Sequence, residues 1–112
     1  MRAEVLKGHL DGLLLAALAD GPRHGYAIIE VLRNRTSGSL DLPTGTIYPA
    51  LHRLERAGLI SSTWLSDSPR PRRVYRLTAA GRRGLRESRA NWAEFSTVVS
   101  AVMDGRPWSA PA

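Results

Sequence analysis

The amino-acid sequence predicts a mainly α-helical domain with a small β-hairpin, followed by one long helix. Three observations lead to this fold class. Before residue 58, apolar residues recur at spacings of three and four in three short segments, which is the pattern of amphipathic helices. Two segments rich in β-branched and aromatic residues then flank a loop of prolines, serines and arginines. Beyond residue 78, apolar residues stand seven apart, as in helices that pair with another helix.

The first two predicted helices end at clear breakers. Glu4–Ala19 carries one apolar stripe, and Asp20-Gly21-Pro22 stops it. His24–Thr36 is the second amphipathic segment, and we expect His24 to act as a local cap or turn residue. A Thr-Ser-Gly-Ser stretch ends this helix, and a short extended connector at positions 40–43 leads to the next segment.

The third predicted helix runs from about Gly45 to Ala57, with Thr44 as its N-cap and Gly58 as its C-cap. Projection at about 100° per residue gathers apolar side chains on one face: Ile47, Ala50, Leu51 and Leu54. The remaining surface carries hydroxyl, aromatic, imidazole and guanidinium groups: Thr46, Tyr48, Pro49, His52, Arg53 and Arg56. We place Pro49 in or near the first turn, where a missing N–H group is tolerated.

Two strands are predicted next, at Leu59–Leu65 and Arg73–Leu77, around a turn-rich loop. They form a hairpin, and we interpret Trp64, like Tyr26 on the second helix, as a packing residue. The last helix begins after Thr78 and runs to about Met103. Its apolar residues form an a/d heptad seam with one polar interruption: Leu85, Trp92 and Val99 in one row, and Ser88, Phe95 and Val102 in the other.

This order divides the chain into three parts. Residues 1–78 form a winged helix–turn–helix domain, residues 79–104 a C-terminal dimerisation helix, and residues 105–112 a frayed, flexible tail. The second and third helices are joined by a short segment, and the third leads directly into the hairpin, which is the winged-helix order. A helix with an apolar back and a polar front suits the major groove of B-DNA, and arginines of the wing can reach flanking phosphates.

Composition supports a polyanionic partner and excludes several other classes. The chain has 16 Lys and Arg against 10 Asp and Glu, a net charge of +6, and every basic residue except Lys7 is arginine. That balance favours nucleic acid or an anionic membrane surface. Because there is no cysteine, disulfides, Cys-based zinc sites and thiol catalysis are excluded.

We expect neither an enzyme nor a bound cofactor or metal. The three histidines lie on different elements, and no nucleophile–base pair or phosphate-cradling loop is present. The apolar run Leu10–Leu18 is too short to span a membrane, and no signal peptide is recognisable. A cytoplasmic protein that does not bind membranes is therefore expected.

The residues expected to contact DNA come from the third helix and the wing: Thr44, Thr46, Tyr48, Pro49, His52, Arg53, Arg70, Arg72 and Arg73. Tyr48 could instead be a half-buried helix residue without a DNA contact. The other helix positions could form an ordinary solvated face, and the wing arginines an ordinary solvated loop. The alternative function is a winged-helix module that binds protein, which would require an apolar outward face on the third helix. The observed face is polar and basic, and it favours DNA.

The sequence also resembles the PadR family of regulators, in its short form with a single C-terminal helix. The resemblance rests on Tyr48-Pro49-Ala50-Leu51-His52-Arg53-Leu54-Glu55, on Gly25-Tyr26, and on Arg73-Val74-Tyr75-Arg76-Leu77-Thr78 with Ala80-Gly81. It covers residues 4–103. In relatives an aromatic residue usually precedes the tyrosine of the wing, whereas here that position is Val74, and Pro69 and Pro71 stiffen the loop.

The resemblance implies a homodimeric repressor whose third helix enters the major groove, with Tyr48 near the DNA backbone. It also implies that the last helix packs against the partner's first and last helices, and that flat aromatic effectors can bind beside the residue at the Trp92 position. The residues assigned to this dimer core or effector site are Leu6, Leu10, Trp92, Phe95 and Val99. Plain dimer core is the more usual role for residues such as Trp92 and Phe95, and a ligand cage is the alternative. We therefore expect sequence-specific binding to a near-palindromic operator with half-sites about 10 bp apart, released by a small molecule.

Overall fold

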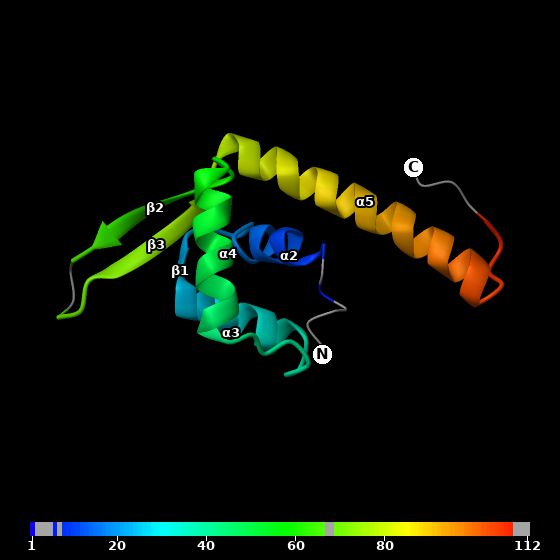
Figure 1. The fold of residues 1–112 in the computed structure, drawn as a ribbon, viewed down its shortest axis with the longest axis horizontal. Helices are drawn as coiled ribbons and strands as arrows, with labels where there is room; N and C mark the ends of the chain where they lie inside the picture. Colours follow the sequence, from blue (N-terminus) through cyan, green and yellow to red (C-terminus); the bar gives the residue numbers. More distant parts are fainter. Residues whose placement is uncertain (2–5, 7, 67–68, 109–112) are drawn as a thin grey trace.

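The computed structural model describes Met1, Leu6, residues 8–66 and residues 69–108. Within these residues the elements are α2 (Leu10–Ala17), β1 (Arg23–His24), α3 (Gly25–Arg35), α4 (Thr44–Arg56), β2 (Ile60–Leu65), β3 (Arg72–Leu77) and α5 (Ala79–Met103). Figure 1 shows α2, α3 and α4 grouped together, with the β2–β3 hairpin projecting to one side and α5 extending to the other. The mainly α-helical class with a small hairpin is confirmed.

The core lies where the three short helices meet the base of the hairpin. Each helix buries the apolar stripe that its spacing predicts, and the sheet adds residues from β2 and β3. The buried side chains with almost no exposure include Leu14, Leu18, Ile28, Ile47, Leu51, Leu54, Ile60 and Tyr75. The back of α4 is therefore fixed, which determines which of its faces points to solvent.

The sheet has three antiparallel strands in the order β1-β3-β2. The hairpin was predicted, but the two-residue strand β1 was not, because Arg23-His24 is too short to carry an alternating pattern. It joins the edge of β3, with Arg23 opposite Tyr75 and His24 opposite Val74. This pairing fixes the start of α3 against the wing.

Helix boundaries confirm two predicted caps and correct others. His24 Nδ1 accepts a hydrogen bond from the Ala27 N–H group at 3.3 Å, and Thr78 Oγ1 accepts one from the Gly81 N–H group at 3.0 Å. Thr44, predicted as a cap, is instead the first residue of α4, and Pro43 occupies the cap position without a side-chain hydrogen bond. Proline fits there because its fixed φ angle suits the extended cap conformation.

The predicted helix Glu4–Ala19 is interrupted: Leu6 is helical, and α2 covers only Leu10–Ala17. A turn with Gly8 at φ 84° precedes α2, which begins at Leu10. Residues 2–5 and 7 lie outside the described residues, so the beginning of the predicted helix is not placed. Of the predicted tail, residues 105–108 belong to no helix or strand, and 109–112 also lie outside the described part.

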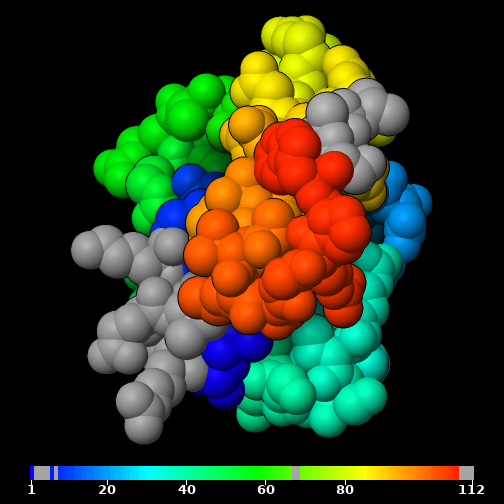
Figure 2. Space-filling view, turned by 90° about the vertical axis from the view of Figure 1, so that its right-hand side faces the viewer, coloured from blue at the N-terminus to red at the C-terminus, as the bar shows by residue number. Residues whose placement is uncertain are grey.

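The two halves of α5 differ in their surroundings. Leu85 is buried, and Ser88 lies so close to α2 that a Cβ atom added at Gly12 would come within 3.0 Å of it. Beyond that point Phe95, Val102 and other apolar side chains are exposed. Figure 2 views the molecule from this end, with the C-terminal half of α5 (orange to red) in front. Among the described residues, no helix has the length and apolar character needed to cross a membrane.

Candidate nucleic-acid interface

The outward face of α4 is polar and positively charged. The helix buries Ile47, Ala50, Leu51 and Leu54, and the exposed strip opposite them consists of Gly45, Pro49, His52 and Arg56. This strip contains no carboxylate. Pro49 is the sixth residue of the helix rather than part of the first turn, so the Gly45 carbonyl lacks its usual N–H partner within α4. The face offers an imidazole, a guanidinium group and a flat pyrrolidine ring to a partner.

Arg56 was not among the residues expected to contact DNA. The sequence placed it only among the polar surface residues of the third helix. The four positions 45, 49, 52 and 56 follow the spacing of one helical face, and they lie opposite the buried set. A helical projection of the sequence therefore contained the information needed to place Arg56 on the outward face.

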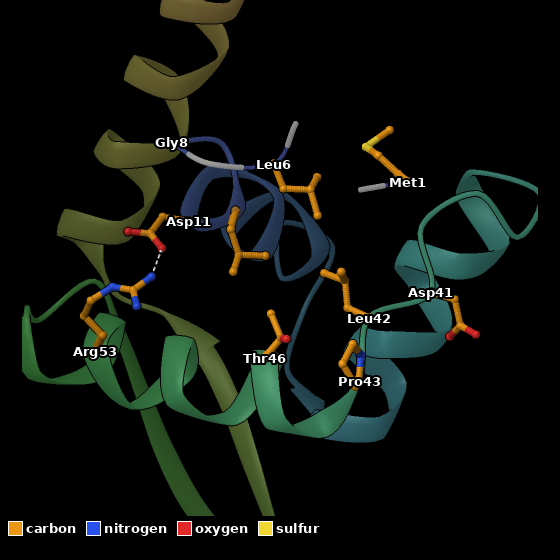
Figure 3. Close-up of a pocket in the computed structure, with 10 residues that line it drawn as sticks. Met1, Leu6, Gly8, Asp11, Asp41, Leu42, Pro43, Thr46 and Arg53 are labelled. Atoms are coloured by element: carbon orange, nitrogen blue, oxygen red, sulfur yellow. Dashed lines mark hydrogen bonds and ion pairs between the residues drawn. The ribbon is translucent and has the colours of Figure 1, made fainter. Parts of the chain in front are cut away.

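One edge of this face turns toward α2. Arg53 forms an ion pair with Asp11 of α2, and both side chains are about half exposed. Figure 3 shows Arg53 and Thr46 beside a hollow of about 700 Å³ between α4, α2 and the connector before α4. Two predicted contact residues thus lie together on this edge, away from the centre of the outward strip.

The opposite edge carries Tyr48, which is half-buried against the start of α3. A Cβ atom added at Gly25 would lie 2.4 Å from the Tyr48 hydroxyl oxygen, so the phenol ring occupies space that only glycine leaves free. Thr44 is exposed at the beginning of α4. Tyr48 is therefore fixed between α3 and α4 with its hydroxyl group close to the N-terminus of α3.

The wing arginines fall into two groups. Arg70 and Arg72 are exposed near the tip of the hairpin. Arg73 turns inward: its Nε donates to Ser62 Oγ at 2.6 Å, and its Nη2 lies 3.4 Å from Glu55 Oε1 on α4. Trp64 lies beside it, with the guanidinium carbon 5.5 Å from the ring centroid. The side chain of Arg73 thus faces α4.

Two residues predicted to be packing residues are exposed. Tyr26 is 62% exposed and Trp64 is 63% exposed, so that interpretation was wrong. Aromatic character alone predicted their burial, but Tyr26 lies on the solvent side of α3 and Trp64 lies toward the outer end of β2. Tyr75 of β3 is the aromatic residue of the wing that is buried, and burial raises the pKa of its phenol above the ordinary 10.0.

The predicted dimer-core residues do not share one environment. Leu6 is buried in the core of its own chain and Leu10 packs against that core. Trp92 and Phe95 are about half exposed and form an aromatic cluster with His9, with ring centroids 5.7 to 6.1 Å apart, while Val99 is half-buried further along α5. Within the described residues, no group of three or more His, Cys, Asp or Glu could hold a metal ion.

Comparison with known proteins agrees with this architecture. Residues 14–87 match the family described as transcriptional regulator PadR-like. A transcriptional regulator of Mycobacterium tuberculosis is 38% identical over 86 residues, which cover 77% of this chain and 78% of that protein. A PadR family regulator of Eggerthella lenta has a TM-score of 0.80 and 33% identity, over 92% of this chain and 88% of that one.

A more distant structure is that of Bacillus subtilis PadR in complex with operator DNA. It has a TM-score of 0.65 and 24% identity, over 70% of this chain and 45% of that one, and the likeness extends to the fold alone. The family match covers more than half of the chain, and this family is one of transcriptional regulators rather than enzymes. The chain therefore belongs to the PadR-like family of transcriptional regulators.

Proposed function

We propose that this protein binds operator DNA in a sequence-specific manner as a homodimer, with α4 in the major groove and the wing over flanking phosphates. The observation that carries the proposal is the outward strip of α4, which is polar and basic and whose four residues include no carboxylate. Groove-binding helices need such a front on an apolar back. The distant B. subtilis relative was crystallised with operator DNA, which is consistent with this use of the fold.

Dimerisation through α5 is part of the proposal. The C-terminal half of α5 exposes Phe95, Val98, Val102 and Met103, more apolar surface than a lone helix end would leave in water. A two-fold dimer would place two copies of α4 about one helical turn apart, so the operator would be a near-palindrome with half-sites about 10 bp apart. The predicted division at residues 78 and 104 belongs to this proposal.

Repression and its release by an effector complete the proposal. The half-exposed rings of Trp92, Phe95 and His9 form a surface on which a flat aromatic molecule could stack. Such a ligand would act by favouring a dimer geometry unfit for DNA. Isothermal titration with a panel of planar aromatic compounds tests this step, and a panel that leaves heat and Trp92 fluorescence unchanged would remove it. A regulator of this kind would work in the cytoplasm.

The central test is fluorescence anisotropy with labelled genomic upstream duplexes and random-sequence duplexes at two salt concentrations. Tight, sequence-dependent binding that weakens with salt is expected. Arg56→Gln should lower the affinity, and removing a side chain that binds one phosphate should reduce the salt slope by about one unit. Arg106→Gln, an exposed arginine beyond α5, is the matched control. If the wild-type protein binds no duplex at low salt, the protein-interaction alternative replaces this proposal.

A further inference from the structure

The inner face of the hairpin changes character along its length. Ile60, Ser62 and Trp64 alternate on one face of β2, opposite Leu77, Tyr75 and Arg73 of β3. Ile60 and Tyr75 are almost completely buried, Ser62 is half-buried, and Trp64 is exposed. The hairpin therefore leaves the core at the level of Ser62, and beyond this level apolar packing no longer holds it against α4.

At this level three polar side chains from α4, β2 and β3 meet. Ser62 Oγ donates to Glu55 Oε2 at 2.6 Å and accepts from Arg73 Nε at 2.6 Å. Arg73 Nη2 also lies 3.4 Å from Glu55 Oε1, so the three groups close a ring of hydrogen bonds and charge. The Trp64 ring covers the guanidinium group from outside. We call Glu55, Ser62 and Arg73 the wing brace.

We propose that the wing brace sets the angle between α4 and the hairpin, and that Arg73 is a positioning residue rather than a phosphate contact. The inference rests on the proposed DNA-binding function. Glu55 lies in the last turn of α4, where a carboxylate is unfavourable next to the helix dipole, so helix stability does not explain it. Its charge instead neutralises Arg73, which leaves Arg73 little net attraction for DNA phosphates.

Neutralising Glu55 separates the two roles of Arg73, because they predict opposite signs. If Arg73 binds phosphate and Glu55 merely competes with the DNA, Glu55→Gln releases Arg73 and tightens binding. If the wing brace positions the hairpin, the same change loosens the wing and weakens binding by roughly tenfold, without changing the salt slope. Arg73→Lys keeps the charge but loses the guanidinium fork, so it should weaken binding as well.

The experiment combines salt-dependent anisotropy with NMR relaxation of the Trp64 indole N–H group in the DNA-free protein. Glu55→Gln, Arg73→Lys and Ser62→Ala should all increase the mobility of this group, with thermal unfolding curves checking that each variant is folded. The single variant Arg73→Gln completes a double-mutant cycle with Glu55→Gln. The double variant should bind no more weakly than the weaker-binding of these two single variants, because both changes disrupt the same wing brace.

Two controls and two outcomes decide the proposal. Arg72→Gln, at an exposed wing arginine, should reduce the salt slope and leave the Trp64 mobility unchanged. Asp11→Asn removes a different carboxylate that pairs with an α4 arginine and should not loosen the wing. Tighter binding by Glu55→Gln, or unchanged Trp64 mobility in the brace variants, would overturn the inference. Failure of the wild-type protein to bind DNA would instead overturn the proposed function, while the relaxation data still test the wing brace.

Discussion

The two halves of α5 carry the same seven-residue seam but lie in different environments. Leu85 in the first half is 5% exposed, whereas Val102 in the second half is 80% exposed. The first half packs on α2 and on the turn between α4 and β2, and the second half extends past the domain (Figure 1). The seam thus indicates which face of the helix is apolar, but it does not say whether the surface that covers it belongs to the same chain.

The first half is fixed by close backbone contact as well as by apolar packing. Thr78 donates from its backbone N–H group to the Leu59 carbonyl at 3.1 Å and from Oγ1 to the Gly58 carbonyl at 2.6 Å. A Cβ atom added at Gly81 would lie 1.9 Å from the Leu59 carbonyl oxygen. Any side chain there would push α5 away from the turn that joins α4 to β2.

The largest effect is therefore expected for Gly81→Ala. The methyl group cannot fit without moving backbone, and such overpacking should lower the free energy of unfolding by about 3 kcal/mol. Gly84→Ala, one turn further along, is the matched control. Its Cβ atom would make ordinary contacts at 3.5 Å with Leu15 and 3.7 Å with Leu59, and alanine should stabilise the helix by up to about 1 kcal/mol. Urea unfolding gives the sign of the change in the free energy of unfolding for each variant. Similar changes for the two variants would contradict this explanation of how the first half of α5 is fixed.

The second half is tested with Phe95→Asp. If a partner subunit covers this face, burying a carboxylate there should raise the dimer dissociation constant by about a hundredfold or more, while leaving the domain folded. Sedimentation velocity over a concentration series measures the constant, and circular dichroism checks the fold. Glu94→Gln, a neighbouring exposed position on a different face of the helix, should leave the dimer intact. A wild-type protein that remains monomeric at high concentration would remove the dimer from the proposal.

Sequence patterns predicted the elements whose evidence is local. The apolar stripes, the caps His24 and Thr78 and both hairpin strands depend on spacing or on neighbouring residues, and the structure places them as predicted. Strand β1 and the Asp11–Arg53 ion pair depend on contacts between distant parts of the chain. No periodic pattern encodes such contacts, so they could not be predicted.

The candidate interface was predicted as a surface, but its internal arrangement was not. The apolar back of α4 indicated which way its front points, and Pro49 and His52 lie on that front. Charge alone could not tell an arginine held by a carboxylate from one that faces solvent. Arg53 and Arg73 proved to be partnered within the chain, whereas Arg56 faces outward and was absent from the predicted set.

A smaller effect is expected from the buried phenol of Tyr75. Burial is the main cause of its raised pKa, and Arg73 opposes the shift. Because the folded state then favours the neutral phenol, its contribution to stability is complete below pH 10 and is lost as the pH rises through the raised pKa. Urea unfolding between pH 8 and about 11 should show this loss. The free energy of unfolding of Tyr75→Phe should depend less on pH over that range. That of Tyr26→Phe, at an exposed tyrosine, should follow the wild-type protein.

The smallest effect on stability is expected for Asp11→Asn. The Asp11–Arg53 pair joins α2 to α4 at the surface, and with both side chains about half exposed the pair should contribute only about 0.5 kcal/mol. Asp11→Asn should also affect DNA binding, because Arg53 would lose a competing carboxylate at the edge of the interface. We expect Asp11→Asn to bind DNA roughly threefold more tightly. Gly81→Ala should lower the free energy of unfolding by the same amount in the Asp11→Asn background as in the wild-type protein, since the effects of distant sites add. Weaker binding would mean that Arg53 serves, like Arg73, to position α4 rather than to contact DNA.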